Sequence, residues 1–398
     1  MRADAVVVGA GPAGLIAARE IASRGYDVKV IEEHPKIGVP NHCAGLISAE
    51  GLRRLGLEPS PEFIQHEIAG GRIYSPSGTA IEVRAERTRA YAVDRAALDA
   101  HLADRATDAG AEIITGARAD ELLTSGGAVC GVKGTGFEID STIVIDDEGA
   151  SRKLLGQITT PKHKAPLTGL NVEVKADAEP SMVEVWLGRR YAPGLFAWVI
   201  PLGEGRARCG LASYDHAPER LAAFLRTRFG IEESPAPRGG PVLTGGPLRR
   251  TSFRGLLIVG DAAGHTKPTT GGGVVLGGLC AMEAARVASD ALGEGDTSWK
   301  FLRRYDDSWR RLYGGEFDAM LVARRFADRL SDDRFDRLLS SLRAEGLEGL
   351  LLGVVEEGDM DLQRGAIMRA LRNPRILSML VRGAGRLAVS ELAALVNV

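Results

Sequence analysis

The sequence predicts an α/β fold in three parts: a Rossmann-type domain, an inserted β-sheet domain and a C-terminal helical region. Three observations support this prediction. Residues 4–33 read as strand, glycine turn, helix and strand; residues 256–275 read as another buried strand followed by a glycine-rich loop; and alternating strand patterns lie between them. The 398 residues are enough to build more than one core.

The first unit has the order that a nucleotide-binding fold requires. Ala5–Val8 is a short apolar run typical of a buried strand, Leu15–Ser23 has a helical pattern, and Val28–Ile31 is a second buried strand that ends at Glu32. A carboxylate at the end of the second strand can accept hydrogen bonds from both ribose hydroxyls of a dinucleotide. We therefore expect Glu32 to bind a ribose.

The turn between the first strand and the helix has the spacing GxGxxG. Gly9 permits the tight turn, Gly11 lets the backbone approach a pyrophosphate, and Gly14 lets the helix pack close to the strand. The helix N-terminus then offers free N–H groups and a partial positive charge to the phosphates. The predicted phosphate contacts are Gly9, Gly11, Ala13 and Gly14.

The C-terminal half distinguishes FAD from NAD. Leu256–Val259 is a further buried strand, and the dipeptide Gly260-Asp261 ends it. A carboxylate at this place can bind the hydroxyls of a flavin ribityl chain. The loop Lys267–Gly273 then leads into a helix whose positive end would face the flavin N1–O2 edge, where negative charge develops on reduction. The predicted flavin contacts here are Asp261, Gly272, Gly273 and Val274.

Three segments between these motifs complete the predicted FAD site. Residues 91–102 read as the end of a strand, a cap at Asp94 and an amphipathic helix. Residues 109–122 read as one strand, in which the backbone of Ala119 could pair with an adenine. Residues 143–149 read as a strand that runs into an acidic turn near the pyrophosphate.

Taken together, these motifs resemble the flavoprotein superfamily that contains p-hydroxybenzoate hydroxylase. The resemblance covers about the first 290 residues and rests on GxGxxG, an arginine-containing helix at Arg95, a late Gly-Asp, and the turn DDEGAS, which departs from the usual Asp-Gly form. It implies one bound FAD, with Arg95 among its contacts.

Within that superfamily the chain looks like the geranylgeranyl reductase family, especially its archaeal digeranylgeranylglycerophospholipid reductases. Ile37–Ser48 is similar to the family's Cys-Ala loop, which implies that Cys43 and Ala44 lie beside the flavin. Pro193–Pro201 resembles the family's PxxYxWxFP substrate motif, although Phe stands for Tyr and Ile for Phe. The resemblance implies a substrate wall made of Pro193, Phe196, Trp198 and Pro201.

The residues themselves leave two roles open. Trp198 alternates with its neighbours along one predicted strand, so it could line an apolar pocket or belong to the core of a sheet. Cys43 could be a buried small hydrophobe that shapes the pocket, or the acid that supplies a proton, since a thiol is a stronger acid than a hydroxyl. Cys43 is our one candidate catalytic residue. His265 is a further candidate for a polar contact at the flavin edge.

We expect a discontinuous domain organisation. Residues 1–70, 90–155 and 245–300 would form the FAD domain, residues 71–89 and 156–244 a β-sheet domain over the flavin, and residues 301–398 a helical region. Several arginines in that region would form either a solvated helical face or a contact with lipid phosphates at a membrane surface; they are Arg324, Arg325, Arg329, Arg334 and Arg337.

Composition limits the classes of partner. The formal net charge of −2 gives no broad positive field for nucleic acid. The four cysteines, at positions 43, 130, 209 and 280, are far apart and include no CxxC pair, which argues against a zinc site and a disulfide framework. No apolar stretch of about twenty residues and no signal-peptide pattern is present, so we expect a cytoplasmic protein, with peripheral contact at the inner face of the membrane as an alternative.

The predicted reaction is hydrogenation of isolated C=C bonds in geranylgeranyl chains, either of isoprenoid ether lipids or of geranylgeranyl diphosphate, with hydride from the reduced flavin. An unactivated alkene has no carbonyl to polarise, so the protein would contribute positioning and a dry site. The external electron donor stays open between NAD(P)H, a ferredoxin and a deazaflavin. Two other functions stay open: a flavin-dependent monooxygenase, and a non-catalytic protein that binds FAD or lipid.

Overall fold

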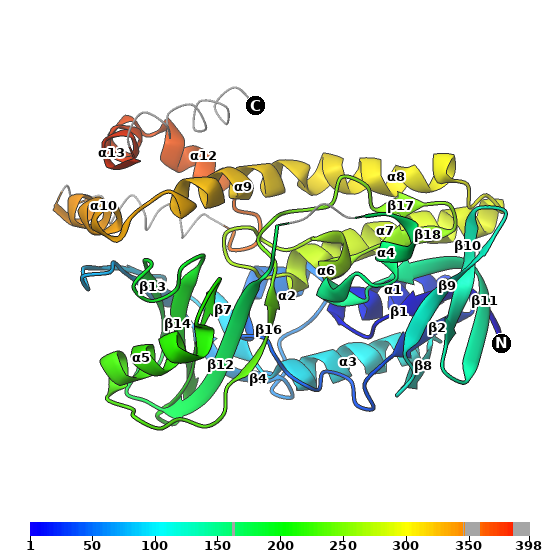
Figure 1. The fold of residues 1–398 in the computed structure, drawn as a ribbon, viewed down its shortest axis with the longest axis horizontal. Helices are drawn as coiled ribbons and strands as arrows, with labels where there is room; N and C mark the ends of the chain where they lie inside the picture. The colour runs from blue at the N-terminus through cyan, green and yellow to red at the C-terminus, as the bar shows by residue number, and fades with distance from the viewer. Residues whose placement is uncertain (161–163, 345, 347–358, 385–398) are drawn as a thin grey trace.

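The structure, a computed structural model, describes residues 1–160, 164–344, 346 and 359–384. It is a mixed α/β fold of elongated shape, with one large sheet near each end and long helices along one side (Figure 1). The N-terminal strands lie at one end, and the sheet formed mostly by residues 167–242 lies at the other. This arrangement confirms the predicted fold class, with an antiparallel sheet region and C-terminal helices.

The first sheet has eight strands and a parallel centre. Its order is β17-β18-β11-β1-β2-β8, with β10 and β9 continuing from β11 as antiparallel strands. The parallel strands carry apolar residues on both faces, as expected of strands that helices cover on both sides. The strands are β1 (Arg2–Val8), β2 (Val28–Glu32), β8 (Glu112–Thr115), β9 (Ala119–Ser125), β10 (Ala128–Gly134), β11 (Phe137–Asp146), β17 (Ser252–Phe253) and β18 (Leu256–Ile258).

Three helices cover one face of this sheet: α1 (Pro12–Ala22), α3 (Arg95–Asp108) and α7 (Val274–Glu294). Helix α1 lies between the other two, and small side chains and glycines let α1 and α7 approach closely. The short helices α4 (Leu155–Ile158) and α6 (Gly260–Ala263) pack on the other face. Helix α1 follows strand β1, and α7 follows β18 after a loop. Both helices begin near the carboxyl edge of the parallel strands, where α/β folds bind nucleotides.

The second large sheet has seven strands in the order β16-β12-β15-β14-β13-β5-β6. All neighbours are antiparallel except β13 and β5. Helix α5 (Ala217–Phe229) covers one face, and the other face packs on Ala44, Leu46 and Ala92. The strands are β5 (Gly70–Tyr74), β6 (Ala80–Arg84), β12 (Leu167–Lys175), β13 (Met182–Leu187), β14 (Phe196–Gly203), β15 (Arg206–Ser213) and β16 (Arg238–Val242).

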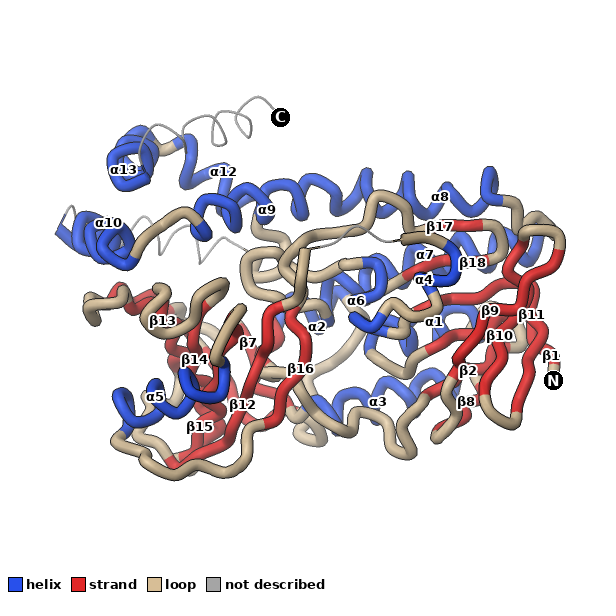
Figure 2. Tube along the Cα trace, viewed as in Figure 1, coloured by secondary structure: helices blue, strands red, loops and turns tan. Residues whose placement is uncertain are grey.

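A small sheet joins the two large ones (Figure 2). It contains β3 (Leu46–Ser48), β7 (Ala90–Val93) and β4 (Ile64–Ile68), with β7 in the middle. Helix α2 (Ala49–Arg54) follows β3 directly, and the Ser48 hydroxyl caps it by accepting a hydrogen bond from Gly51 N at 2.7 Å.

The C-terminal region is helical in the described residues. Helix α8 (Trp299–Trp309) continues through a π-helical turn (Arg310–Gly314) into α9 (Gly315–Asp328). The remaining helices are α10 (Asp332–Ala344), α12 (Arg364–Arg372) and α13 (Pro374–Ala384). Among the residues placed by the structure, no helix is both long enough and apolar enough to cross a membrane.

One local prediction was wrong, and a second was wrong for a single residue, Arg324. Residues 109–122 form two strands, β8 and β9, because Gly116 adopts φ +69° and turns the chain between them. The arginines of residues 324–337 do not share one face: Arg324 is 5% exposed and donates to Asp328 at 2.6 Å, whereas Arg337 is exposed. Neither a solvated face nor a lipid contact therefore describes Arg324. The predicted domain boundaries stay a prediction.

Candidate functional site

The carboxyl ends of four parallel strands bring the sequence-predicted nucleotide residues together. Gly9 follows β1, Glu32 ends β2, Asp147 follows β11, and Asp261 follows β18 by three residues. These strands are neighbours in the sheet, so segments more than 200 residues apart in the chain share one edge. A parallel sheet binds ligands at this edge.

The glycine turn is too crowded for side chains. A Cβ on Gly9, whose φ is +98°, would lie 2.2 Å from the carbonyl oxygen of Asp147, and a Cβ on Gly14 would lie 2.2 Å from the carbonyl oxygen of Gly9. A Cβ on Gly11 would lie 3.0 Å from an Asp147 carboxylate oxygen. The three glycine positions therefore leave the backbone open where a pyrophosphate would have to approach the N-terminus of α1 closely.

Asp147 is a part of this site that the motif reasoning did not identify. Its carboxylate accepts a hydrogen bond from Gly14 N at 2.7 Å, within the first turn of α1. Burial raises the pKa of Asp147 well above its ordinary value, and the neighbouring carboxylates of Asp261 and Glu32 act in the same direction, while the Gly14 N–H opposes them. An acidic turn was predicted here, but the sequence did not indicate which acid would face the glycines.

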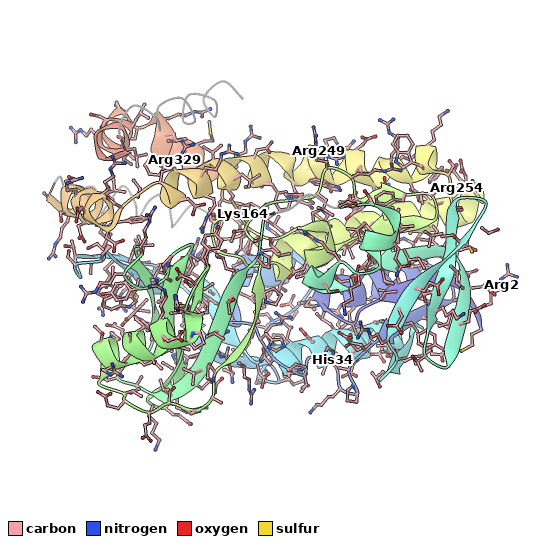
Figure 3. The ribbon with its side chains drawn as sticks, viewed as in Figure 1. Arg2, His34, Lys164, Arg249, Arg254 and Arg329 are labelled. Carbon is pink, nitrogen blue, oxygen red and sulfur yellow. The ribbon has the colours of Figure 1, made fainter. Side chains whose placement is uncertain are left out.

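Glu32 lies beside the glycine turn as predicted. Its carboxylate accepts from Ala10 N at 2.8 Å and from His34 N at 2.9 Å. The ring of His34, which is labelled in Figure 3, also approaches Glu32, with Nδ1 2.6 Å from Oε1. The backbone N–H of Ala117 bonds to the carbonyl of Glu32 at 2.9 Å, so the segment that leads to Ala119 lies alongside. Ala119 itself pairs with Gly134 in β9 and β10.

Arg95 begins α3 and is at the centre of a buried charged cluster. It donates to both carboxylate oxygens of Asp99, each at 3.0 Å, and it lies close enough to Cys43 to interact with it electrostatically. Burial opposes the charge on Arg95, yet Asp99 and Cys43 together raise its pKa. Burial also raises the pKa of Asp99, although Arg95 opposes this. The spacing of four residues between Arg95 and Asp99 on one helix was the available sequence signal for this pair.

Asp261 lies next to the start of α7. A Cβ on Gly273 would lie 2.8 Å from its carboxylate, so the loop borders this acid at Gly273, between the predicted contacts Gly272 and Val274. Burial raises the pKa of Asp261, while Arg95 and Arg152 oppose that shift. Arg152 donates to the carbonyl oxygens of Ala262 and Asp261 at 2.9 and 3.1 Å, which fixes the turn after β18.

Cys43 lies in a loop whose backbone is hydrogen-bonded to side chains of the seven-stranded sheet both before and after Cys43. Asn171 Nδ2 donates to the carbonyl of His42 at 2.9 Å, and Arg208 Nη1 donates to the carbonyl of Ala44 at 2.9 Å. The sulfur of Cys43 accepts from Gly45 N at 3.3 Å. We call residues 42–45 the Cys43 loop. It is thus tied to strands β12 and β15, which sequence motifs did not indicate.

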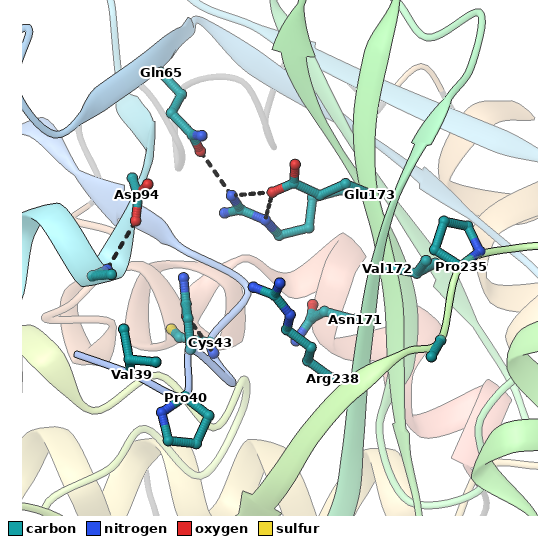
Figure 4. A pocket seen from close by; sticks show the side chains of 14 residues that line it. Val39, Pro40, Cys43, Gln65, Asp94, Asn171, Val172, Glu173, Pro235 and Arg238 are labelled. Atoms are coloured by element: carbon teal, nitrogen blue, oxygen red, sulfur yellow. Dashed lines mark hydrogen bonds and ion pairs between the residues drawn. The ribbon is translucent and has the colours of Figure 1, made fainter. Parts of the chain in front are cut away.

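A cavity of about 600 Å³ lies between the Cys43 loop, the start of α3 and the sheet (Figure 4). Its lining is mixed: apolar residues such as Val39, Pro40 and Val172 lie beside polar and charged ones, which include Cys43, Gln65, Asp94, Asn171, Glu173, Arg208 and Arg238. Arg208 is 4% exposed and bonds to Glu173 and Gln65 at 2.8 and 2.7 Å, whereas Arg238 is exposed. The cavity therefore combines charged side chains with apolar ones next to Cys43.

The Pro193–Pro201 segment ends up beside the Cys43 loop. Trp198 is 8% exposed and packs in a cluster with Ala44 and Leu46, and its Nε1 donates to Asn171 at 3.0 Å. Phe196 contacts Trp198 edge-on, Pro201 is buried, and Pro193 is half-buried. Trp198 is therefore a core residue that also contacts the loop carrying Cys43. Whether Pro193, Phe196, Trp198 and Pro201 touch a substrate stays a prediction.

His265 does not present a polar group at this edge. Its ring is fully buried among Tyr305, Trp309 and Phe317, and neither ring nitrogen has a hydrogen-bond partner among the described residues. Burial, with a further contribution from Arg310, lowers the pKa of His265 to about 3. The ring is neutral and part of the packing behind the loop.

These residues fit an FAD. Glu32 at the end of β2, the glycine turn after β1, and Asp261 beyond β18 lie along one edge of the sheet in the order in which FAD carries its ribose, pyrophosphate and ribityl groups. The buried carboxylates, among them the Asp146 group whose Oδ2 has no partner in the described residues, are hydrogen-bond acceptors that need donors. The hydroxyl groups of a ribose or a ribityl chain can supply them.

Comparison with known proteins gives consistent matches over nearly the whole chain. The sequence profile of the lycopene cyclase protein family matches residues 4–359. A digeranylgeranylglycerophospholipid reductase 2 of Methanothermobacter thermautotrophicus is 36% identical over 363 residues, which are 88% of this chain and 94% of that protein. A second such reductase, from Methanopyrus kandleri, is 35% identical over 89% of this chain and 93% of its own length.

Solved structures agree with these sequence matches. A geranylgeranyl bacteriochlorophyll reductase-like protein of Thermoplasma acidophilum superimposes with a TM-score of 0.84 at 26% identity, and the match covers 99% of each chain. A flavin-dependent brominase superimposes with a TM-score of 0.68 at 18% identity, over 93% of this chain and 98% of its own, which shows a shared fold only.

Proposed function

Because the chain belongs to the geranylgeranyl reductase family, within the superfamily of FAD-dependent oxidoreductases and lycopene cyclases, we propose that it binds FAD and hydrogenates C=C bonds of geranylgeranyl chains. The chain is a reductase of the digeranylgeranylglycerophospholipid reductase type. The proposed substrate is an isoprenoid ether lipid, with geranylgeranyl diphosphate as the alternative form of the same chain. The immediate electron donor stays open between NAD(P)H, a ferredoxin and a deazaflavin.

One observation carries the proposal: Cys43 lines a cavity and lies near Arg95, and Arg95 is also close enough to Asp261 to influence its pKa. A thiol that borders a cavity, a cation paired with Asp99, and the predicted flavin acid therefore lie near one another. Cys43 is half-buried and thus accessible from the cavity, unlike the buried Cys209 and Cys280.

The proposed cofactor contacts follow from the geometry. Glu32 would hold the ribose, the backbone of Gly9, Gly11, Ala13 and Gly14 the pyrophosphate, and Asp261 the ribityl chain. Ala119 would meet the adenine, and Arg95, Ala44, Gly272, Gly273 and Val274 would border the flavin ring. Bound and reduced, FAD supplies the hydride that an unactivated alkene requires.

The protein would supply the proton and the positioning. The thiol of Cys43 is the proposed proton donor, and the guanidinium of Arg95 and the N–H of Gly45 are placed at its sulfur, where they stabilise the negative charge that remains after the proton leaves. Asn171 and Arg208 bind the carbonyl groups on each side of Cys43, which fixes the backbone from which its side chain projects. Pro193, Phe196, Trp198 and Pro201 are the proposed wall for the isoprenoid chain.

A single anaerobic experiment tests the proposal. The purified protein is loaded with FAD, the flavin is reduced chemically, and a geranylgeranyl ether lipid is added without oxygen. We expect the yellow oxidised flavin to return at the rate at which the lipid gains hydrogen, measured by absorbance and by mass spectrometry. Reoxidation only after oxygen is admitted, with a hydroxylated product, would instead indicate a monooxygenase. No lipid-dependent reoxidation and no product would indicate a binding protein.

The proposed cellular location is the cytoplasm, with peripheral contact at the inner face of the membrane. A lipid substrate supports that contact, since the alkene chains of an ether lipid begin in a bilayer. Sedimentation of the protein with vesicles of the substrate lipid tests it.

A further inference from the structure

A short C-terminal segment is bound to the loop that precedes α7. Asp361 is 3% exposed and accepts a hydrogen bond from Lys267 Nζ at 2.6 Å, and Lys267 Nζ also donates to the carbonyl of Met360 at 3.2 Å. Two residues further along each segment, Thr269 donates to Gln363 Oε1 at 2.7 Å. Segment 359–363 therefore contacts the predicted flavin loop, Lys267–Gly273, through two side chains of that loop.

The same segment is held firmly from other directions. Ser48, the cap of α2, also donates to the second oxygen of Asp361, and Arg54 at the end of α2 pairs with Asp359 at 2.9 Å. Asp359 Oδ1 accepts from Asp361 N at 2.7 Å and so fixes the local turn. The carboxylate of Asp361 is thus positioned by groups that do not depend on Lys267.

Lys267 lies close to the amino end of α7. Its backbone N–H bonds to the carbonyl of Gly272 at 2.9 Å, and a Cβ on Gly272 would lie 2.9 Å from Lys267 Cε. The next residue, Gly273, caps α7 and borders Asp261. The side chain of Lys267 is 13% exposed, so solvent screens the charge of its ammonium group little.

We propose that Lys267 and Asp361 are positioning residues that together set the reduction potential of the flavin. The inference rests on the proposed FAD site, in which the loop Lys267–Gly273 and the start of α7 border the ring edge that gains negative charge on reduction. A cation there favours the reduced flavin, and a paired carboxylate cancels that effect. Asp361 therefore keeps the flavin a strong reductant, as transfer of hydride to an unactivated alkene demands.

The two residues should act with opposite signs, which distinguishes charge from mere structural support. Asp361→Asn leaves the charge on Lys267 uncompensated. At a fixed potential, the ratio of reduced to oxidised flavin should therefore rise about tenfold. This corresponds to an increase of the midpoint potential by about 30 mV for a two-electron couple. Lys267→Gln leaves the carboxylate uncompensated and should shift the ratio by a similar factor in the opposite direction. The double variant should return close to the wild-type value.

The measurement is an anaerobic reductive titration of the FAD-loaded protein against a reference dye, read from flavin absorbance. Asp359→Asn is the matched control: it breaks the Arg54 pair of the same segment without changing the charge at Lys267, and it should leave the potential unchanged. Should Asp361→Asn fail to fold, Lys267→Arg and Lys267→Gln serve in its place: arginine should keep the wild-type potential and glutamine should lower it.

The outcomes separate this inference from the proposed function. Single variants that bind FAD and show unchanged potentials, or potentials shifted in the same direction, would overturn the inference and leave the reductase proposal intact. A wild-type chain that takes up no FAD would overturn both.

Discussion

Replacing His265 with leucine should remove a specific loss of stability in mild acid. The ring of His265 is fully buried, has no hydrogen-bond partner among the described residues, and has a pKa of about 3. An unfolded chain would protonate the same histidine near its ordinary pKa of about 6.5. Between these two pH values the unfolded state binds more protons than the folded state. The free energy of unfolding is therefore unaffected by His265 above about pH 6.5, and it decreases as the pH falls from there towards 3.

The size of the effect follows from the shift. Each pH unit in that window costs about 1.4 kcal/mol, so the wild type should lose about 2 kcal/mol between pH 7 and pH 5 through this one group. His265→Leu has no such proton to bind. We therefore expect the free energy of unfolding of the variant to fall about 2 kcal/mol less than that of the wild type over the same change in pH.

The assay is urea denaturation of the FAD-loaded protein at pH 7 and pH 5, followed by far-UV circular dichroism. Other titrating groups are common to both proteins and cancel in the comparison. His216→Asn is a suitable control, because His216 is exposed and adopts a left-handed conformation that asparagine tolerates. Equal losses of stability in the wild type and His265→Leu would refute the reasoning and would mean that His265 acquires a proton acceptor in solution.

Three further predictions concern the proposed site. Glu32→Ala should weaken FAD binding by roughly 1.5–3 kcal/mol, the range for hydrogen bonds to a charged group, with an intact fold; an unchanged dissociation constant would assign the ribose to another residue. Cys43→Ser should keep FAD but slow double-bond reduction more than about tenfold, and wild-type rates would show that water supplies the proton. Trp198→Phe should lower the free energy of unfolding by about 1–3 kcal/mol, because Asn171 loses a buried hydrogen-bond donor. It should also lower the rate of lipid-dependent flavin reoxidation. A loss of stability with full turnover per folded molecule would mean that Trp198 has only a core role.

The parts of the fold and site that sequence predicts well are those fixed by local geometry. The strand, glycine turn, helix and strand of residues 2–32 follow from periodicity and from glycines that only a crowded turn requires. The cap at Asp94 is also local: its carboxylate accepts from Ala96 N and Ala97 N, two and three residues away. The same is true of Asp261, which lies three residues after the apolar strand β18.

The contacts that sequence did not reveal join distant segments. Nothing in the pattern of β12 distinguishes Asn171 from an ordinary buried polar residue, yet it connects Trp198 with the carbonyl of His42. Arg208 and Asp361 reach their partners across 164 and 94 residues. Such contacts depend on how the two sheets and the C-terminal region pack, and a single sequence carries no local signal for that packing.

The strand order of the first sheet has a consequence for how the chain is made. Strand β11 lies between β1 and β18, and β18 is synthesised about 110 residues after β11 ends. At roughly 5–20 residues per second, a ribosome would take about 5 to 20 s to cover that interval, during which one edge of β11 lacks its parallel neighbour. The intervening residues provide five of the seven strands of the other large sheet, and β5 and β6 are made before them, so that sheet can assemble before the nucleotide-binding edge is complete. Newly made chains would then expose a hydrophobic strand edge, and holding it apart from other chains until residues 256–258 emerge is a task suited to a chaperone.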